Sequence, residues 1–289
     1  MAIVKKSFRD YKEEGSNWIT LATGEFYPDI LVDACSLYKP VVELFGLLLK
    51  SSESSEKLFL RTVDIKQPWM RVQLARVFRK YVSPNTPVEM LKQKRKAEWI
   101  CKEFGKGFRS VVEVQKAFLS RPVPDEALCA LLWEYKDRGQ KGYDMTERMF
   151  ELFRSNLPNL KILGPERAGR DVLLGEVFED YPKPDRPADF IIKDVDKILA
   201  VGFARYDSDR GGAQEDDRTG GYSNASRELL EYAVGKNLRT KVIFVNDGPG
   251  LLLGSMWDDY SDIEEVSDDI KVVTLRMIPE RITVKWLNS

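Results

Sequence analysis

The chain has 289 residues, and its 45 Lys and Arg against 46 Asp and Glu leave a formal net charge of −1. Its 43% hydrophobic and 31% charged residues are typical of a globular protein and exclude a disordered one. Histidine is absent, which excludes Ser-His-Asp and Cys-His catalysis and the usual zinc hydrolases. Any catalysis must therefore use carboxylates, Lys, Arg, Tyr or a metal ion.

The cysteines and the apolar stretches exclude two further classes of protein. Cys35, Cys101 and Cys129 are far apart and form no CxxC pair, so we expect free thiols rather than a disulfide framework or a zinc site. The longest apolar stretch, residues 41–49, contains Glu43 and is too short to span a bilayer. The first residues contain no apolar signal-peptide core, so we expect a cytoplasmic protein without a membrane partner.

Residues 1–140 predict a mostly helical region. Apolar residues recur at helical spacing over residues 31–50 and 69–81, and further helical segments follow to the end of the region. A nucleic-acid binder with this net charge would need to gather its positive charge locally. Lys94 and Arg95 lie in such a basic run, so they are candidate DNA contacts; the alternative is a solvated helix face.

Residues 141–289 alternate between helices and strands. The predicted elements are helix 143–153, strands 171–178, 188–193 and 197–206, helix 224–235, strand 239–245, and strands 270–275 and 282–286. Asp144 is the expected N-cap of the first helix, with Glu147 three residues later as in a capping box. This order predicts an α/β (α+β) fold with a mixed central sheet and helices packed on it.

A polar segment, residues 204–221, follows the strand that ends near Tyr206. It contains five acidic residues, three arginines, a glutamine and four glycines. Carboxylates bind hard cations such as Mg²⁺, and Arg and Gln are well shaped to contact base edges. We therefore expect metal and DNA contacts here, although a surface loop with balanced charge is the simpler alternative. The candidate DNA contacts are Asp209, Arg210, Gln214 and Arg218.

The helix, three strands, helix, strand order, with Pro187-Ala188-Asp189 opening the second core strand, resembles the PD-(D/E)xK nuclease fold. The resemblance is to type II restriction endonucleases and covers about residues 143–250. It implies that an acid at the start of the second strand and an acid-x-Lys on the third hold Mg²⁺ at the scissile phosphate. The implied function is sequence-specific cleavage of double-stranded DNA by a homodimer, with a metal-activated water as the attacking group.

This resemblance assigns site residues position by position. Asp189 matches the first acid, and Glu147 is placed to match an acid on the preceding helix. The acid-x-Lys positions fall on Gly202 and Ala204, which carry neither group. Arg205 is a candidate replacement for the positive charge of the lysine, but its pKa is too high for a base.

The missing acid leaves three explanations open. The first is that an acid at a neighbouring position replaces the missing one, the candidates being Asp207, Asp209 and Glu228. The second is that Gly202 is a disabling substitution. The third is that the chain is a naturally inactive relative. Asp207 is accordingly a candidate metal ligand, with an ion pair to Arg205 as the alternative. Asp171, at the start of the first predicted strand, is a candidate second ligand or a capping acid.

Two other functions remain possible at this point. One is a DNA-binding relative on the same fold that cannot cleave, which the composition of the third strand motivates. The other is an α/β enzyme acting on nucleotides or phosphorylated metabolites, with the Asn246-Asp247-Gly248 turn at its site. The absence of a Walker or GxGxxG pattern weighs against that second alternative.

Overall fold

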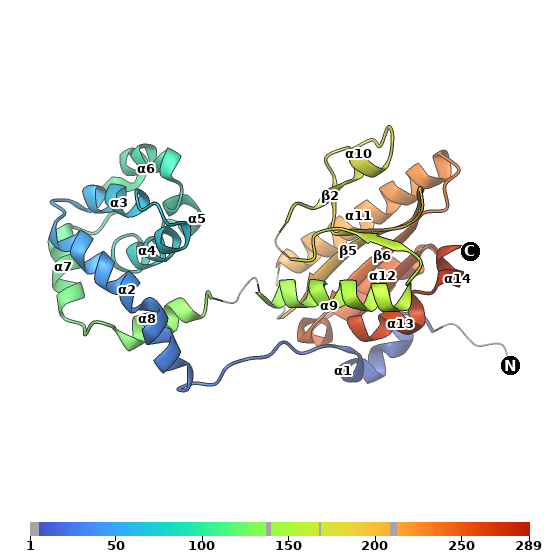
Figure 1. Ribbon diagram of the computed structural model, residues 1–289, viewed down its shortest axis with the longest axis horizontal. Helices are drawn as coiled ribbons and strands as arrows, with labels where there is room; N and C mark the ends of the chain where they lie inside the picture. Colours follow the sequence, from blue (N-terminus) through green and yellow to red (C-terminus); the bar gives the residue numbers. More distant parts are fainter. Residues whose placement is uncertain (1–5, 137–139, 168, 209–212) are drawn as a thin grey trace. The chain divides into compact units, whose positions relative to one another are not determined.

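The computed structural model describes residues 6–136, 140–167, 169–208 and 213–289, with only the backbone of residues 140–143 and 213–219. The chain divides into two units, each with its own core. One unit is Gly24–Arg138 and the other combines Met1–Thr23 with Gly139–Ser289. We call them the helical unit and the sheet unit (Figure 1).

The helical unit is built from short helices around an aromatic core. Its α-helices are α2 (Ile30–Lys50), α3 (Ser55–Val63), α4 (Pro68–Tyr81), α5 (Val88–Leu91), α6 (Ala97–Phe104), α7 (Val111–Leu119) and α8 (Glu126–Trp133). Phe45, Phe59 and Phe78 are fully buried between them. Ser54, Ser110 and Asp125 cap α3, α7 and α8, because each side chain accepts a hydrogen bond from a backbone N–H of the first turn.

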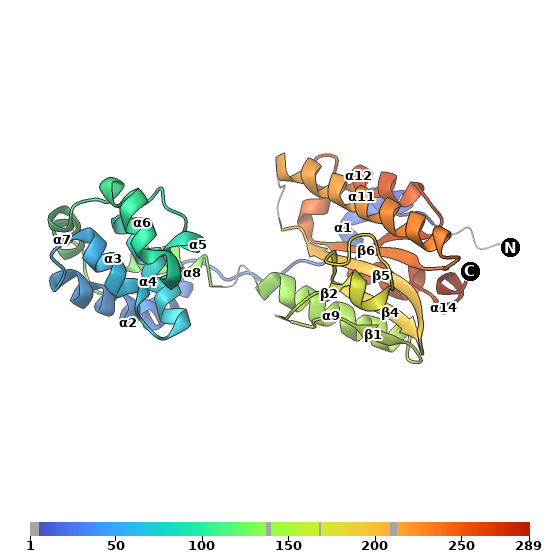
Figure 2. The same ribbon diagram turned by 90° about the horizontal axis from the view of Figure 1, so that it is seen from above.

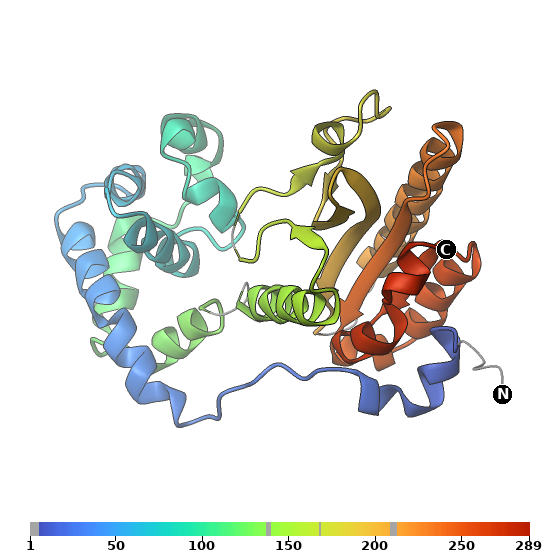
Figure 3. The same ribbon diagram turned by 45° about the vertical axis from the view of Figure 1, so that its right-hand side comes forward.

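The helical region predicted for residues 1–140 begins instead at Gly24. Residues 6–23 form the 3₁₀ helix η1 (Arg9–Glu14) and α1 (Gly15–Trp18), which pack on the sheet unit beside its C-terminal helices (Figure 3). Phe8 stacks on Trp257 with 4.5 Å between ring centroids. Helical periodicity shows that a segment buries one face, but it does not show which core receives that face.

The sheet unit contains a five-stranded mixed sheet, which confirms the predicted fold class. Its strands are β1 (Lys161–Leu163), β4 (Phe190–Asp194), β5 (Lys197–Tyr206), β6 (Lys241–Asp247) and β7 (Ile270–Val273), in the order β1-β4-β5-β6-β7. The β1-β4 and β4-β5 pairs are antiparallel, and the β5-β6 and β6-β7 pairs are parallel. With α9 (Gln140–Asn156) before β1 and α11 (Ala213–Gly235) after β5, the core order is αβββαβ.

Helices cover both faces of this sheet. Figure 2 shows α9 on one side of the strands, and α11 and α12 (Met256–Glu265) on the other. Phe153 of α9 packs on Phe190 of β4, with 5.0 Å between centroids, and Tyr222 of α11 packs on Phe244 of β6 at 4.7 Å. The sheet is therefore buried on both faces, as expected for parallel strands joined by helices.

Some predicted elements are wrong at the start of the sheet. The strand expected over residues 171–178 is β2 (Val172–Leu173) followed by the short helix α10 (Leu174–Val177), and the first core strand is β1. β2 pairs with β3 (Pro187–Ala188) in a separate two-stranded sheet. Within α10, Gly175 lies directly against Pro184: a Cβ atom there would be 2.5 Å from the proline ring, so the packing favours glycine.

Two predicted helix starts and one predicted strand also differ from the structure. Asp144 lies inside α9 rather than at its N-cap, and α11 begins at Ala213, ahead of the predicted residue 224. The strand expected over residues 282–286 is the helix α14 (Val284–Leu287), because the Thr283 side chain accepts a hydrogen bond from Trp286 N–H. An N-cap of this kind starts a helix in a sequence whose apolar residues alternate as in a strand.

Candidate functional site

Asp189 lies between β3 and β4 and is bound to the neighbouring strand β5. Its Oδ2 accepts a hydrogen bond from Ala204 N–H at 2.8 Å, and its own N–H donates to the Gly202 carbonyl at 3.0 Å. Its side chain is half-buried. Burial raises the pKa of Asp189, the Ala204 hydrogen bond opposes this effect, and the negative charge of Asp171 adds to it.

Asp171 interacts with Asp189 because the small sheet holds them together. Asp171 immediately precedes β2, Asp189 immediately follows β3, and the antiparallel register aligns Val172 with Ala188. Asp171 is exposed, whereas Asp189 is half-buried. Two carboxylates that repel one another favour a bound cation.

The donor chemistry of this acid pair fits Mg²⁺. Mg²⁺ in proteins commonly binds one or two carboxylates and takes its other ligands from water and substrate phosphates. No group of three or more acidic or cysteine side chains that could hold a metal occurs in the part of the chain that the structure describes. Asp171 and Asp189 are the residues that would hold such an ion.

Gly202, the position expected to carry an acid, is covered by the ring of Phe190. The two residues are directly paired across β4 and β5. A Cβ atom at residue 202 would lie 1.9 Å from Cζ of that ring. The packing is therefore evidence against the explanation that Gly202 is a disabling replacement of an acid, since an acidic side chain has no room there.

Arg205 and Asp207, expected near the metal and the phosphate, form an ion pair instead. Arg205 Nε donates to Asp207 Oδ1 at 2.7 Å, and the hydroxyl of Tyr260 lies 3.4 Å from Asp207 Oδ2. The Asp207 side chain is only 1% exposed. Both carboxylate oxygens are engaged in the core, so the structure favours the ion-pair alternative over the metal-ligand role.

Glu147 and Glu228 are also engaged with basic or hydroxyl groups. Glu147 accepts from the Arg167 guanidinium at 2.7 Å and is partly exposed on α9. Glu228 of α11 accepts from Tyr181 at 2.9 Å and from Arg186 at 2.9 Å, and also pairs with Lys183. Glu228 thus ties α11 to the loop before β3 and is not available as the replacement acid.

The candidate DNA contacts fall into two groups. Lys94 and Arg95 are exposed in the helical unit and line a cavity of about 540 Å³ with Arg61, and Lys94 pairs with Asp64. Asp209 and Arg210 lie outside the described residues. Gln214 and Arg218 lie in α11, in the part whose side chains are not described.

Two arginines on the segment that leads into Asp171 were not among the site residues expected from the sequence. Arg167 and Arg170 lie on the segment between Gly164 and Asp171, and both side chains are exposed. The run Glu166-Arg167 and the adjacency of Arg170 to Asp171 are a signal in the sequence for this site. The predicted site begins at Asp171, the first residue of the predicted strand, and so did not include the preceding segment.

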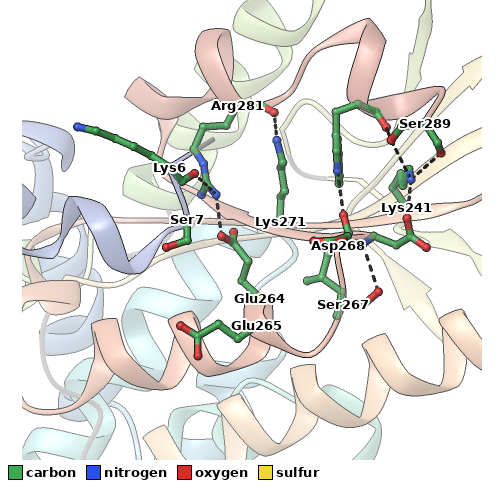
Figure 4. Close-up of a pocket in the computed structure, with 13 residues that line it drawn as sticks. Lys6, Ser7, Lys241, Glu264, Glu265, Ser267, Asp268, Lys271, Arg281 and Ser289 are labelled. Carbon is green, nitrogen blue, oxygen red and sulfur yellow. Dashed lines mark hydrogen bonds and ion pairs between the residues drawn. The ribbon is translucent and has the colours of Figure 1, made fainter. Parts of the chain in front are cut away.

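A larger cavity, of about 780 Å³, lies at the amino ends of β6 and β7 (Figure 4). Lys241 is buried there and donates to Asp269 at 2.5 Å and to the Ser289 backbone oxygen at 2.9 Å. Arg281 is buried against Glu264 at 2.7 Å. Each of these two buried cations is paired with an acidic side chain, so neither is available to a phosphodiester.

The turn after β6 does not form a phosphate-binding loop. Asp247 is fully buried, and its carboxylate accepts backbone hydrogen bonds from Thr20, Gly248 and Leu275 at 2.6, 2.6 and 3.1 Å. The N–H group of Gly248 is thus occupied by the protein itself. This geometry weighs against the nucleotide or phosphate-metabolite enzyme as the function.

The comparisons with known proteins add no family. The chain matches no protein-family profile and has no significant similarity to a curated protein. Among the described residues, no helix has the length and apolar character needed to cross a bilayer. The function is therefore inferred from the fold and from the residues around Asp189.

Proposed function

We propose that this protein is a Mg²⁺-dependent endonuclease that cleaves double-stranded DNA at specific sequences, as type II restriction enzymes do. The Asp171–Asp189 pair, attached to an αβββαβ core, carries this proposal. Asp189 occupies the position where the resemblance implied the first metal ligand. A homodimer in the cytoplasm is part of the same proposal, because a two-fold enzyme suits a symmetric DNA site.

The distribution of charge supports a DNA partner. The helical unit has 20 Lys and Arg against 15 Asp and Glu, whereas the chain as a whole has a net charge of −1. Residues 57–109 alone have 14 basic and 4 acidic residues. A local excess of this kind is the electrostatic pattern of a nucleic-acid-binding surface.

The residues of the acid pair have separable tasks in the proposed reaction. Asp189 is oriented by the Ala204 N–H, which donates to its Oδ2, and it is the first metal ligand of the proposed site. Asp171 adds the second negative charge at the open edge of the site. A bound Mg²⁺ would neutralise the scissile phosphate and lower the pKa of a water molecule there.

The test is a cleavage assay on long mixed-sequence duplex DNA with Mg²⁺ or Mn²⁺. We expect discrete fragments from the native chain and a loss of at least roughly 100-fold in rate for Asp189→Asn and Asp171→Asn. Asp262→Asn is the matched control, since this exposed carboxylate pairs with Arg9 on another surface. The proposed site is wrong if Asp189→Asn cuts as the native protein does.

If Asp189→Asn does not cleave DNA, unfolding of the variant would not be the explanation. Burial and the charge of Asp171 together raise the pKa of Asp189, which means that the folded protein disfavours the ionised form of this carboxyl group. An asparagine retains an acceptor for Ala204 N–H without the charge. The unfolding midpoint of Asp189→Asn is therefore expected to equal or exceed that of the native protein.

A second candidate is a DNA-binding relative that does not cleave. The third core strand favours it, since Gly202 is sealed by Phe190 and the charge of Arg205 is neutralised by Asp207. This candidate predicts salt-dependent binding of duplex DNA and no cleavage with either metal. The nuclease predicts fragments in the same assay, so a single experiment separates the two functions.

A further inference from the structure

Arg167 and Arg170 are two exposed cations on the segment that leads into Asp171, and each forms a surface ion pair with an acidic side chain. Their side chains are 65% and 70% exposed. Arg167 pairs with Glu147 of α9, and Arg170 pairs with Glu176 of α10, both at 2.7 Å. Exposed ion pairs contribute little to stability, so their partners can be exchanged at small cost.

The segment that carries these arginines begins and ends at the acid pair. Its first residue, Gly164, has φ of +144° and lies so close to Asp189 that a Cβ atom would be 2.3 Å from the Asp189 carbonyl oxygen. Its last residue is Asp171, which follows Arg170 directly. Arg154 of α9 also pairs with Glu166, so the segment is fastened to α9 at two neighbouring positions.

Cations are needed at this place if a phosphate is to approach. Two carboxylates repel a polyanion, and the sheet unit is acidic, with 25 Lys and Arg against 31 Asp and Glu. A guanidinium binds a phosphate in the same bidentate way as it binds a carboxylate. A phosphate group can therefore replace Glu147 and Glu176 as the partners of the two arginines.

We propose that Arg167 and Arg170 bind DNA backbone phosphates next to the acid pair, and that Glu147 and Glu176 are their counterions in the absence of DNA. This inference rests on the proposed function and deepens it, because it identifies the residues that place the DNA backbone at the site. The arginines are positioning residues: they hold the substrate, while Asp171 and Asp189 face the reacting phosphate.

The experiment measures binding of a labelled mixed-sequence duplex to the full-length chain in EDTA, where cleavage does not occur. Arg167→Ala and Arg170→Ala are each expected to weaken binding roughly tenfold and to reduce the slope of log K against log salt by about 1. Glu176→Gln is expected to strengthen binding, since it releases Arg170 from its counterion. Arg9→Ala is the matched control: this exposed arginine pairs with Asp258, Asp262 and Glu265 on a different surface, so its removal leaves affinity and slope unchanged.

The opposite signs distinguish a phosphate contact from a structural ion pair. If the pairs serve only to hold the loop, Arg170→Ala and Glu176→Gln would have the same effect on binding, which would overturn the inference. Equal affinities and salt slopes for the native chain and both arginine variants would also overturn it, while the proposed function would stand. If the native chain does not bind duplex DNA, the inference and the proposed function fail together.

Discussion

At the scale of single residues, Gly202 shows how a local rule is overridden by a non-local contact. Glycine in a strand interior loses backbone entropy and leaves a gap in the packing, and both effects are unfavourable. Here the ring of Phe190 fills that gap from the neighbouring strand. A glycine that is anomalous in the nuclease pattern is thus required by the packing of β4 on β5.

Gly202→Ala is expected to destabilise the sheet unit by about 1–3 kcal/mol, because the added methyl group overpacks the site against Phe190. Phe190→Ala removes the ring, so Gly202→Ala should destabilise the Phe190→Ala variant much less than it destabilises the native protein. Urea denaturation of the two single variants and the double variant measures the coupling energy. Additive effects of the two substitutions would contradict the proposed contact.

At the scale of secondary-structure elements, side-chain caps determine where several helices begin. Asp125 accepts from Leu128 N–H at 3.2 Å and from Arg121 Nε at 2.7 Å, so it closes the first turn of α8. The ion pair with Arg121 lowers the pKa of Asp125 in opposition to burial. Asp125 and Glu126 follow Pro122 and Pro124, and acidic residues directly after such a break are a sequence signal for the start of a helix.

Asp125→Ala is expected to lower the stability of the helical unit by about 1 kcal/mol at neutral pH through loss of the cap. The folded pKa of Asp125 lies below its unfolded value, so this stabilisation is present above the unfolded pKa. It is lost as the pH falls through the folded pKa. Thermal unfolding at several pH values checks this, with Glu126→Gln as a control; a constant difference down to the lowest pH would refute it.

At the scale of the whole molecule, the two units have separate hydrophobic cores. The core of the helical unit contains Phe45, Phe59 and Phe78, and the core of the sheet unit contains Phe8, Phe190 and Phe244. Basic residues predominate in the first unit and acidic residues in the second. This division accords with the proposed function, in which the helical unit would contribute DNA affinity and the sheet unit carries the acid pair.

Phe8→Ala is expected to lower the free energy of unfolding of the sheet unit by about 3 kcal/mol, because Phe8 is fully buried against Trp257. The transition of the helical unit should be unchanged. Hydrogen exchange followed by mass spectrometry assigns each change to a unit. Destabilisation of residues 24–138 by Phe8→Ala would show that the N-terminal segment belongs to the other core.

The fold class and five of the core elements follow from the amino-acid sequence alone. Alternating and helical periodicities located α9, β4, β5, α11 and β6, because these patterns depend on neighbours within a few residues. The absence of histidine limited the chemistry in the same direct way. Asp189 was selected through the order of the strands, and its role as a ligand stays a prediction.

Which polar groups meet depends on the tertiary structure. It paired Arg205 with Asp207, joined Glu228 to Tyr181, and brought Asp171 to Asp189 through the register of β2 and β3. It also assigned residues 6–23 to the sheet unit. These outcomes were not readable from local patterns, because hydrogen bonds, ion pairs and ring contacts depend on distances between residues that strand pairing and packing bring together.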